Sequence, residues 1–124
     1  MGRIETSFII TTNKIPINDI AEQIGIEPFY VRTTFPNNSI AEPFWYVEVS
    51  SDSCCIEEPL TKLASVLEHS KSEIADVLRK TETIPTVLVV INSDYEDRPE
   101  ITFSPTVLAF FAQFDAEICI EVNS

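Results

Sequence analysis

The clearest alternation of hydrophobic and polar positions lies near the C-terminus, in residues 116–122. A period of two is typical of a strand with one buried face. The alternation divides six side chains between two faces, with Ile118, Ile120 and Val122 on one and Glu117, Cys119 and Glu121 on the other. We expect the hydrophobic face to meet the core.

A strand and a capped helix are predicted just before this segment. Residues 101–103 are β-branched and aromatic, which favours a strand. Ser104 is a residue type that caps helix N-termini, and Pro105 suits the first helical position. Hydrophobic residues then recur at near-helical spacing as far as Phe114. The C-terminal pattern therefore predicts strand, capped helix and strand.

The N-terminal part of the chain begins with a similar order of elements. Residues 6–12 predict a strand whose inward side chains are Phe8 and Ile10. Residues 17–24 predict a short helix, because their isoleucines and one alanine fall on a single helical face. Gly25 then stands where a helix favours a left-handed residue, so we expect the helix to end there.

The next segment contains a second strongly alternating strand. Residues 29–33 indicate a short edge strand, residues 34–43 a loop rich in turn-forming residues, and residues 44–50 a strand. The two faces of this last strand carry Trp45, Val47 and Val49 on one side and Phe44, Tyr46 and Glu48 on the other. We expect Trp45 to be a core residue.

A leucine-rich helical pattern starts near residue 56. Ser70-Lys71-Ser72-Glu73 lies within it and has the pattern of a capping box, which would start a second helix. One bent helix and two consecutive helices both fit, and a break near His69 or Ser70 is slightly favoured. Residues 86–91 form a continuous apolar run typical of an interior strand, and residues 92–100 form a polar loop.

These elements predict one α+β domain over residues 1–124. The expected order is β-α-(β)-β-α-β-β-α-β, where the bracketed strand is residues 29–33. A two-layer sandwich, with helices on one face of a largely antiparallel sheet, buries every hydrophobic face in this order.

The net charge of the chain excludes some classes of binding partner and favours others. Eight basic and 20 acidic residues give a formal net charge of −12 at pH 7. Affinity for nucleic acid and for anionic membranes depends on lysine and arginine, so neither is an expected partner. A basic protein is the natural partner of such a surface, although solubility alone explains the charge equally well. The oligomeric state is left open by the sequence.

Cellular location is predicted from two features of the chain. The three cysteines form an odd set and suggest a reducing compartment. No stretch is long and apolar enough for a membrane span. We therefore expect a cytoplasmic protein.

The sequence offers no candidate pattern for catalysis, metal binding or cofactor binding. His69 is the single histidine and is expected to be an exposed helix residue, which leaves no partner set for a nucleophilic triad. Cys54 and Cys55 are adjacent and poorly placed to share one metal, although a reactive thiol stays open for either. Two glycines are too few for a phosphate-binding loop. No cofactor or metal is expected, and an enzyme is the least favoured class.

The order of motifs resembles the bacterial domain-of-unknown-function family numbered 4279. The resemblance covers nearly the whole chain and rests on five features: residues 8–10, Gly-Ile-Glu-Pro at residues 25–28, Trp45, the leucine-rich residues 60–78, and the closing residues 103–122. It implies the α+β fold but no activity and no site residues. The chain departs from the pattern near Phe114 and Asp115, where a glycine would commonly lie.

A candidate interaction surface follows from the strand alternations. The sheet face away from the core would combine aromatic and acidic side chains, namely Phe44, Tyr46, Glu48, Glu117 and Glu121. Alternatively, another segment such as residues 29–43 folds over the aromatic pair.

The resulting functional hypothesis is a non-enzymatic interaction domain that binds a basic protein. Similar small acidic domains accompany bacterial toxins, so the resemblance adds an immunity-type inhibitor of a basic toxin as an expectation. The rival hypothesis is a module that binds a small ligand in a pocket between the helices and the sheet.

Overall fold

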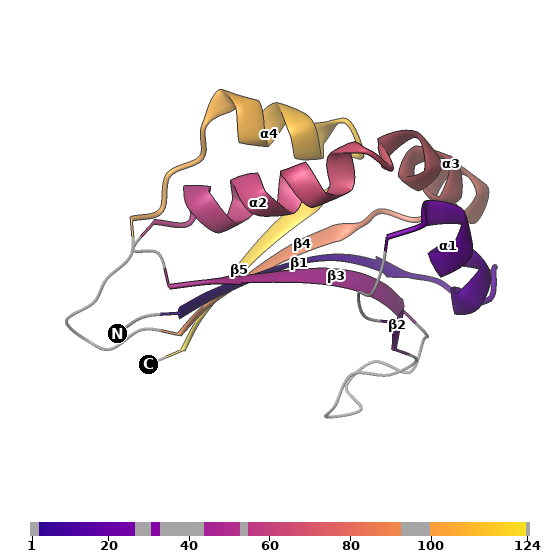
Figure 1. Cartoon of the computed structure of the whole chain (residues 1–124), viewed down its shortest axis with the longest axis horizontal. Helices are drawn as coiled ribbons and strands as arrows, with labels where there is room; N and C mark the ends of the chain where they lie inside the picture. Colours follow the sequence, from indigo (N-terminus) through magenta and orange to yellow (C-terminus); the bar gives the residue numbers. More distant parts are fainter. Residues whose placement is uncertain (1–2, 27–30, 33–43, 53–54, 93–99, 124) are drawn as a thin grey trace.

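Helices cover one face of a five-stranded sheet in the computed structural model of the chain (Figure 1). The structure describes residues 3–26, 31–32, 44–52, 55–92 and 100–123. The elements are β1 (Arg3–Thr11), α1 (Ile17–Ile24), β2 (Val31–Arg32), β3 (Phe44–Ser51), α2 (Glu57–Glu68), α3 (Lys71–Thr81), β4 (Thr86–Asn92), α4 (Pro105–Ala112) and β5 (Glu117–Asn123). No helix within these described ranges has the length and apolar character needed to cross a membrane.

The strands lie in the order β2-β3-β1-β4-β5. All neighbouring pairs are antiparallel except β4 and β5, which are parallel. The predicted α+β fold with a largely antiparallel sheet is therefore confirmed. β4 is an interior strand, as its apolar run indicated, and β5 is the edge strand opposite β2.

The core lies between the helices and the face of the sheet that carries Phe8. Strand register aligns Phe8 with Val47 on β3 and with Val87 on β4, and all three side chains are buried. The ring of Phe8 lies 6.5 Å from that of Phe111 and 5.5 Å from that of Phe114, measured between centroids. The inward-facing Phe8 of β1 thus forms one aromatic cluster with Phe111 of α4 and Phe114 of the turn after it.

Two helix ends, the C-terminal end of α1 and the N-terminal end of α4, are formed by the residues that the sequence predicted. Gly25 ends α1 with a φ of 73°, a left-handed conformation that glycine adopts without steric cost. Ser104 caps α4, because its hydroxyl oxygen accepts a hydrogen bond from the Val107 N–H at 3.2 Å. Pro105 is the first residue of that helix.

The leucine-rich segment forms two helices, α2 and α3, and the break falls at His69 and Ser70. The predicted capping box is wrong. The Ser70 hydroxyl donates to the Ile24 carbonyl oxygen at 2.8 Å and makes no capping hydrogen bond to α3. A buried hydroxyl has one proton to donate, and here it satisfies a carbonyl at the end of α1. This contact joins α1 to the break between α2 and α3.

The predicted strand at residues 101–103 is also wrong. These residues form no strand, and Ile101 is 50% exposed. Next to them, the described part of the chain has an isolated bridge between Cys55 and Glu100, supported by the Ile56 N–H, which donates to the Glu100 carbonyl at 3.1 Å. A β-branched composition favours a strand only where a neighbouring strand pairs with it. The observed order is accordingly β-α-β-β-α-α-β-α-β.

Asp115 explains how the chain manages without glycine between α4 and β5. Its φ is 55°, in the left-handed region where aspartate is better tolerated than most non-glycine residues. The Asp115 N–H donates to the Ala112 carbonyl at 2.9 Å, which closes the turn. The departure from the family pattern therefore leaves the turn geometry intact.

Trp45→Ala is expected to lower the free energy of unfolding by about 3–5 kcal/mol, because the side chain is fully buried and its removal leaves a large cavity. Urea unfolding followed by circular dichroism measures the change. Leu108→Ala, at a position that is 44% exposed, is the control and should change stability far less. Native-like stability of the Trp45 variant would place this side chain outside the core.

Ser104 and Ser70 give a matched test of hydrogen-bond direction. Ser104 accepts a hydrogen bond, so Ser104→Ala should cost about 0.5–2 kcal/mol while Ser104→Asp should be nearly neutral. Ser70 donates to a carbonyl, so Ser70→Asp should destabilise the protein more than Ser70→Ala does. Thermal unfolding of the four variants measures the effects. Equal effects of aspartate at the two positions would contradict these assignments.

Candidate interaction surface

The five residues of the predicted interaction surface do share one sheet face. Register places Tyr46, Ile9, Thr86 and Glu117 in a single row across β3, β1, β4 and β5. The buried row through Phe8 points to the helices, so this row points away from them. Figure 1 shows the labelled helices on one side of the sheet only. Three strand spacings of about 4.8 Å each separate Tyr46 from Glu117.

The exposure of the side chains differs between the two halves of this sheet face, one formed by β3 and β1 and the other by β4 and β5. Phe44 is 1% exposed and Ile9 is 7% exposed, so the expectation that Phe44 lies on an uncovered surface is wrong. Tyr46 and Glu48 are half-buried, and the Phe44 and Tyr46 ring centroids lie 5.7 Å apart. Alternation along a strand predicts which face a side chain joins but does not predict what covers it. Of residues 29–43, named above as a possible cover, the structure describes only 31–32, which pair with β3 as β2.

The accessible half is formed by β4 and β5, and we call it the β4–β5 face. It comprises Leu88 and Val90, which are half-buried, and Glu117, Cys119 and Glu121, which are exposed. Apolar side chains in the middle with carboxylates at the outer strand resemble the composition of a protein-binding patch. Sequence reasoning found Glu117 and Glu121 but missed Leu88 and Val90, because a continuous apolar run does not tell which alternate residues meet the helices.

Two carboxylates on the remaining part of this sheet face accept hydrogen bonds from neutral side chains. Asn92 donates its side-chain N–H to Glu5 at 3.0 Å, and the Ser7 hydroxyl donates to Glu48 at 3.5 Å. Neither Glu117 nor Glu121 forms an ion pair within the described part of the chain. Their negative charges therefore stand exposed at the sheet edge.

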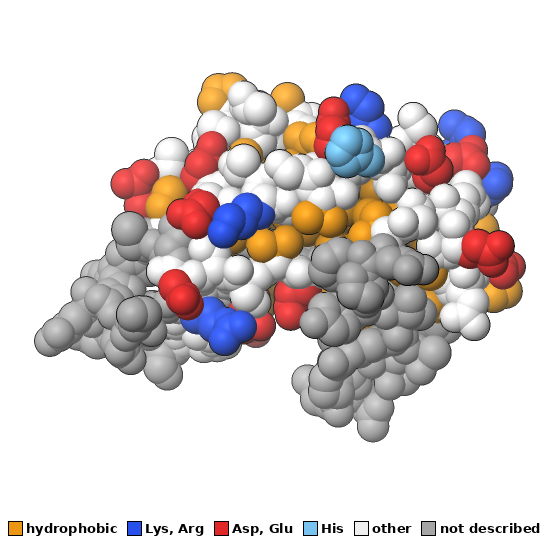
Figure 2. All heavy atoms as spheres, in the orientation of Figure 1, with side chains coloured by type: hydrophobic (Ala, Val, Ile, Leu, Met, Phe, Trp, Pro, Cys, Tyr) orange, Lys and Arg blue, Asp and Glu red, His pale blue; other side chains and the backbone are white. Residues whose placement is uncertain are grey.

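Most described cations pair with a carboxylate three or four residues away in the sequence, on the same helix or, for Lys71 and Glu68, across the break between α2 and α3. Lys62 pairs with Glu58 at 3.4 Å on α2, and the other helical pairs are Lys71 with Glu68 and both Arg79 and Lys80 with Asp76. Figure 2 shows blue basic side chains next to red acidic ones over the helix layer. Such exposed pairs stabilise the helices only slightly, and none of the four cations in them pairs with Glu117 or Glu121. Arg3, the first residue of β1, is exposed on the same sheet face as these two carboxylates.

Among the described residues, the carboxylate of Asp76 has a clearly shifted pKa. A hydrogen bond from Lys80 contributes most and holds the pKa of Asp76 below its usual value, and a hydrogen bond from Gln23 at 2.8 Å acts in the same direction. Because Gln23 lies on α1 and Asp76 on α3, this contact ties the two helices together. Its role is structural.

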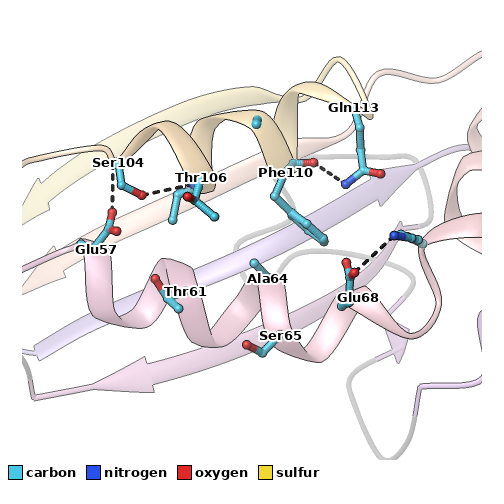
Figure 3. Close-up of a pocket in the computed structure, with 12 residues that line it drawn as sticks. Glu57, Thr61, Ala64, Ser65, Glu68, Ser104, Thr106, Phe110 and Gln113 are labelled. Atoms are coloured by element: carbon cyan, nitrogen blue, oxygen red, sulfur yellow. Dashed lines mark hydrogen bonds and ion pairs between the residues drawn. The ribbon is translucent and has the colours of Figure 1, made fainter.

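A second candidate is a groove between α2 and α4, with a volume of about 760 Å³. Figure 3 shows Phe110 of α4 pointing toward the turn of α2 that carries Ala64. At one end the Glu57 carboxylate accepts a hydrogen bond from the Ser104 N–H at 3.1 Å. At the other end Lys71 pairs with Glu68 at 3.2 Å. The groove lies within the helix layer, whereas the sequence placed a pocket between the helices and the sheet.

Other chemically interesting residues are not brought together. His69 is exposed at the end of α2, Cys55 is half-buried, and Cys119 is exposed on the β4–β5 face. Within the described ranges, no three His, Cys, Asp or Glu side chains are grouped so as to hold a metal ion. Cys54 and the acidic residues Asp94, Glu96 and Asp97 of the predicted polar loop lie outside those ranges.

Comparison with known proteins assigns the family. A sheet covered on one face by helices, with an acidic edge, defines a small α+β domain with a candidate binding surface. The family described as "Domain of unknown function (DUF4279)" matches residues 3–124, and the chain belongs to this family. Neither the curated proteins nor the solved structures gave a match.

Proposed function

We propose that the protein is a non-enzymatic interaction domain that binds a basic protein through the β4–β5 face. The observation that supports the proposal most is the exposure of Glu117 and Glu121 beside Leu88 and Val90, with no described cation paired to either carboxylate. A basic partner would be attracted by the carboxylates and would desolvate the apolar strip between them and β1.

The net charge of −12 supports the same class of partner. A negative potential over the whole molecule steers a cationic protein toward it, and unneutralised charges near the docking patch fix its orientation. An immunity-type inhibitor of a basic bacterial toxin, acting in the cytoplasm, is the specific form of this function that we propose. Inhibition would then follow from occlusion of the basic surface of the toxin.

Charge reversal is the direct test. Glu117→Lys combined with Glu121→Lys should slow association with the native partner roughly tenfold while changing dissociation less, because exposed charges act mainly on encounter. The partner is captured from the source organism with immobilised wild-type protein and identified by mass spectrometry, and its binding rates are then measured by surface plasmon resonance at two salt concentrations.

The matched control is Asp19→Lys combined with Glu22→Lys. These exposed residues lie on α1, which packs beside β2 and β3 at the opposite edge of the sheet, and the control changes the net charge by the same amount. Association of the control should stay close to that of the wild type. An equal loss in both double variants would show that net charge alone matters and would contradict a site on the β4–β5 face.

A small-ligand-binding domain is the alternative, and the α2–α4 groove favours it. The groove is large enough for a small molecule and carries polar side chains such as Thr61 and Gln113 along its walls (Figure 3). Under this alternative a ligand should raise the melting temperature at high salt, where a charge-driven partner would be weakened. Thr61→Trp, which fills the groove from an exposed position, should abolish that shift.

A further inference from the structure

The outer edge of β5 offers backbone hydrogen-bonding groups to another strand. Among the described strands, β5 pairs with β4 alone. The Glu117 N–H donates to the Pro85 carbonyl at 3.0 Å, so the backbone of Glu117 faces β4. In a parallel ladder the backbone groups of alternate residues point to opposite edges. The N–H and C=O groups of Ile118, Ile120 and Val122 therefore point away from β4.

The side chains along this edge are accessible as well. Ile120 is 39% exposed and Val122 is 62% exposed on the helix side of the sheet, while Glu117 and Glu121 are exposed on the other side. Natural edge strands are commonly protected by lysine, proline or a bulge. β5 contains no lysine or proline, and its register with β4 runs without a bulge from Glu117 to Asn123. Its carboxylates repel acidic strands only.

The edge is held in place before any partner arrives. The Asn123 side-chain N–H donates to the Asn92 side-chain oxygen at 3.0 Å, and Asn92 in turn donates to Glu5. This chain of hydrogen bonds ties the end of β5 to β4 and β1. The Asp115 turn fixes the other end. A preorganised strand loses little conformational entropy when another strand adds to it.

From these observations, and resting on the function proposed above, we infer that the partner adds an extended segment to β5 as a sixth strand. The segment would alternate basic and apolar residues. Its lysine or arginine side chains would lie beside Glu117 and Glu121, and its apolar side chains beside Ile118, Ile120 and Val122. Strand addition obtains affinity from backbone hydrogen bonds and specificity from alternate side chains.

A second copy of this chain is a poor occupant of the same edge. Antiparallel pairing of two β5 strands centred on Cys119 would set Glu117 of each copy opposite Glu121 of the other. Like charges directly opposite one another destabilise a strand pair, and the copies also repel through their net charge of −12. The charge pattern therefore favours a basic segment of a different protein.

Amide hydrogen exchange of the full chain, followed by NMR, tests the inference without a known partner. In the free protein the amides of Ile118, Ile120 and Val122 should exchange rapidly, while those of Glu117, Cys119 and Glu121 should be protected by β4. The probe is the peptide Lys-Val-Lys-Val-Lys-Val-Lys with blocked ends. At near saturation it should slow exchange of the three outward amides about tenfold.

The control peptide is Lys-Lys-Val-Val-Val-Lys-Lys, which has the same composition and charge without the alternation. It should bind about tenfold more weakly if each cross-strand pair contributes a few tenths of a kcal/mol. The inference is wrong if both peptides bind equally, if neither binds up to millimolar concentration, or if protection appears elsewhere. Outward amides that are already protected in the free protein, with a dimer in sedimentation analysis, would assign the edge to a second copy and overturn it too.

Ile120→Pro separates this inference from the proposed function. The Ile120 N–H points outward, so proline removes a hydrogen bond that only an added strand would make and leaves both carboxylates in place. Ile120→Thr retains the N–H and is the control. Strand addition is supported if Ile120→Pro loses binding to both the alternating peptide and the partner while Ile120→Thr keeps it. If the proline variant binds the native partner normally and charge reversal slows association as described above, the β4–β5 face is the site but strand addition is wrong. Should the proline variant fail to fold, hydrogen exchange on the wild type decides the question.

Discussion

The burial of Phe8 between β1 and the helix layer is the interaction on which the rest of the structure depends. β1 pairs with both β3 and β4, so Phe8 stands in the middle of the sheet. Phe111 and Phe114 reach it from α4 and the turn after it, although α4 is far from β1 in sequence. Burying an aromatic side chain contributes about 1.5–3 kcal/mol. This cluster fixes α4 over the sheet, and with it the point from which β5 must start.

The position of β5 follows from that constraint. The turn at Asp115 returns the chain from the aromatic cluster to the outside of β4, where it can run only parallel to β4. α4 packs against α2, so it extends over the neighbouring helix and leaves the outer part of β5 uncovered on the helix side. Ile120 and Val122 remain exposed for this reason. The same packing that completes the core therefore leaves an unprotected edge.

Local sequence patterns predicted those elements whose ends are determined by local chemistry. Gly25 and Ser104 act through their own backbone or their own side chain within one turn of the helix, and both ends are confirmed. Ser70 has an equally good local pattern, but its hydroxyl bonds to Ile24, 46 residues away in sequence. The strand predicted at residues 101–103 failed because pairing with a neighbour cannot be seen in the segment itself. The periodicity of a segment does not predict contacts with residues that are far away in the sequence.

The candidate site shows the same limit. Alternation assigned Glu117 and Glu121 to one face with Phe44, and register confirms that they share it. Exposure depends on what lies above the strand, and here it separates buried Phe44 from the open β4–β5 face. Pairing direction matters as much, because a parallel ladder directs the backbone of Ile120 outward together with a half-exposed apolar side chain. The edge of β5, which pairs with no described strand other than β4, carries carboxylates on one side of the sheet and apolar side chains on the other. It can therefore contact the side chains on both faces of an added strand, whereas a flat acidic patch can contact only one face.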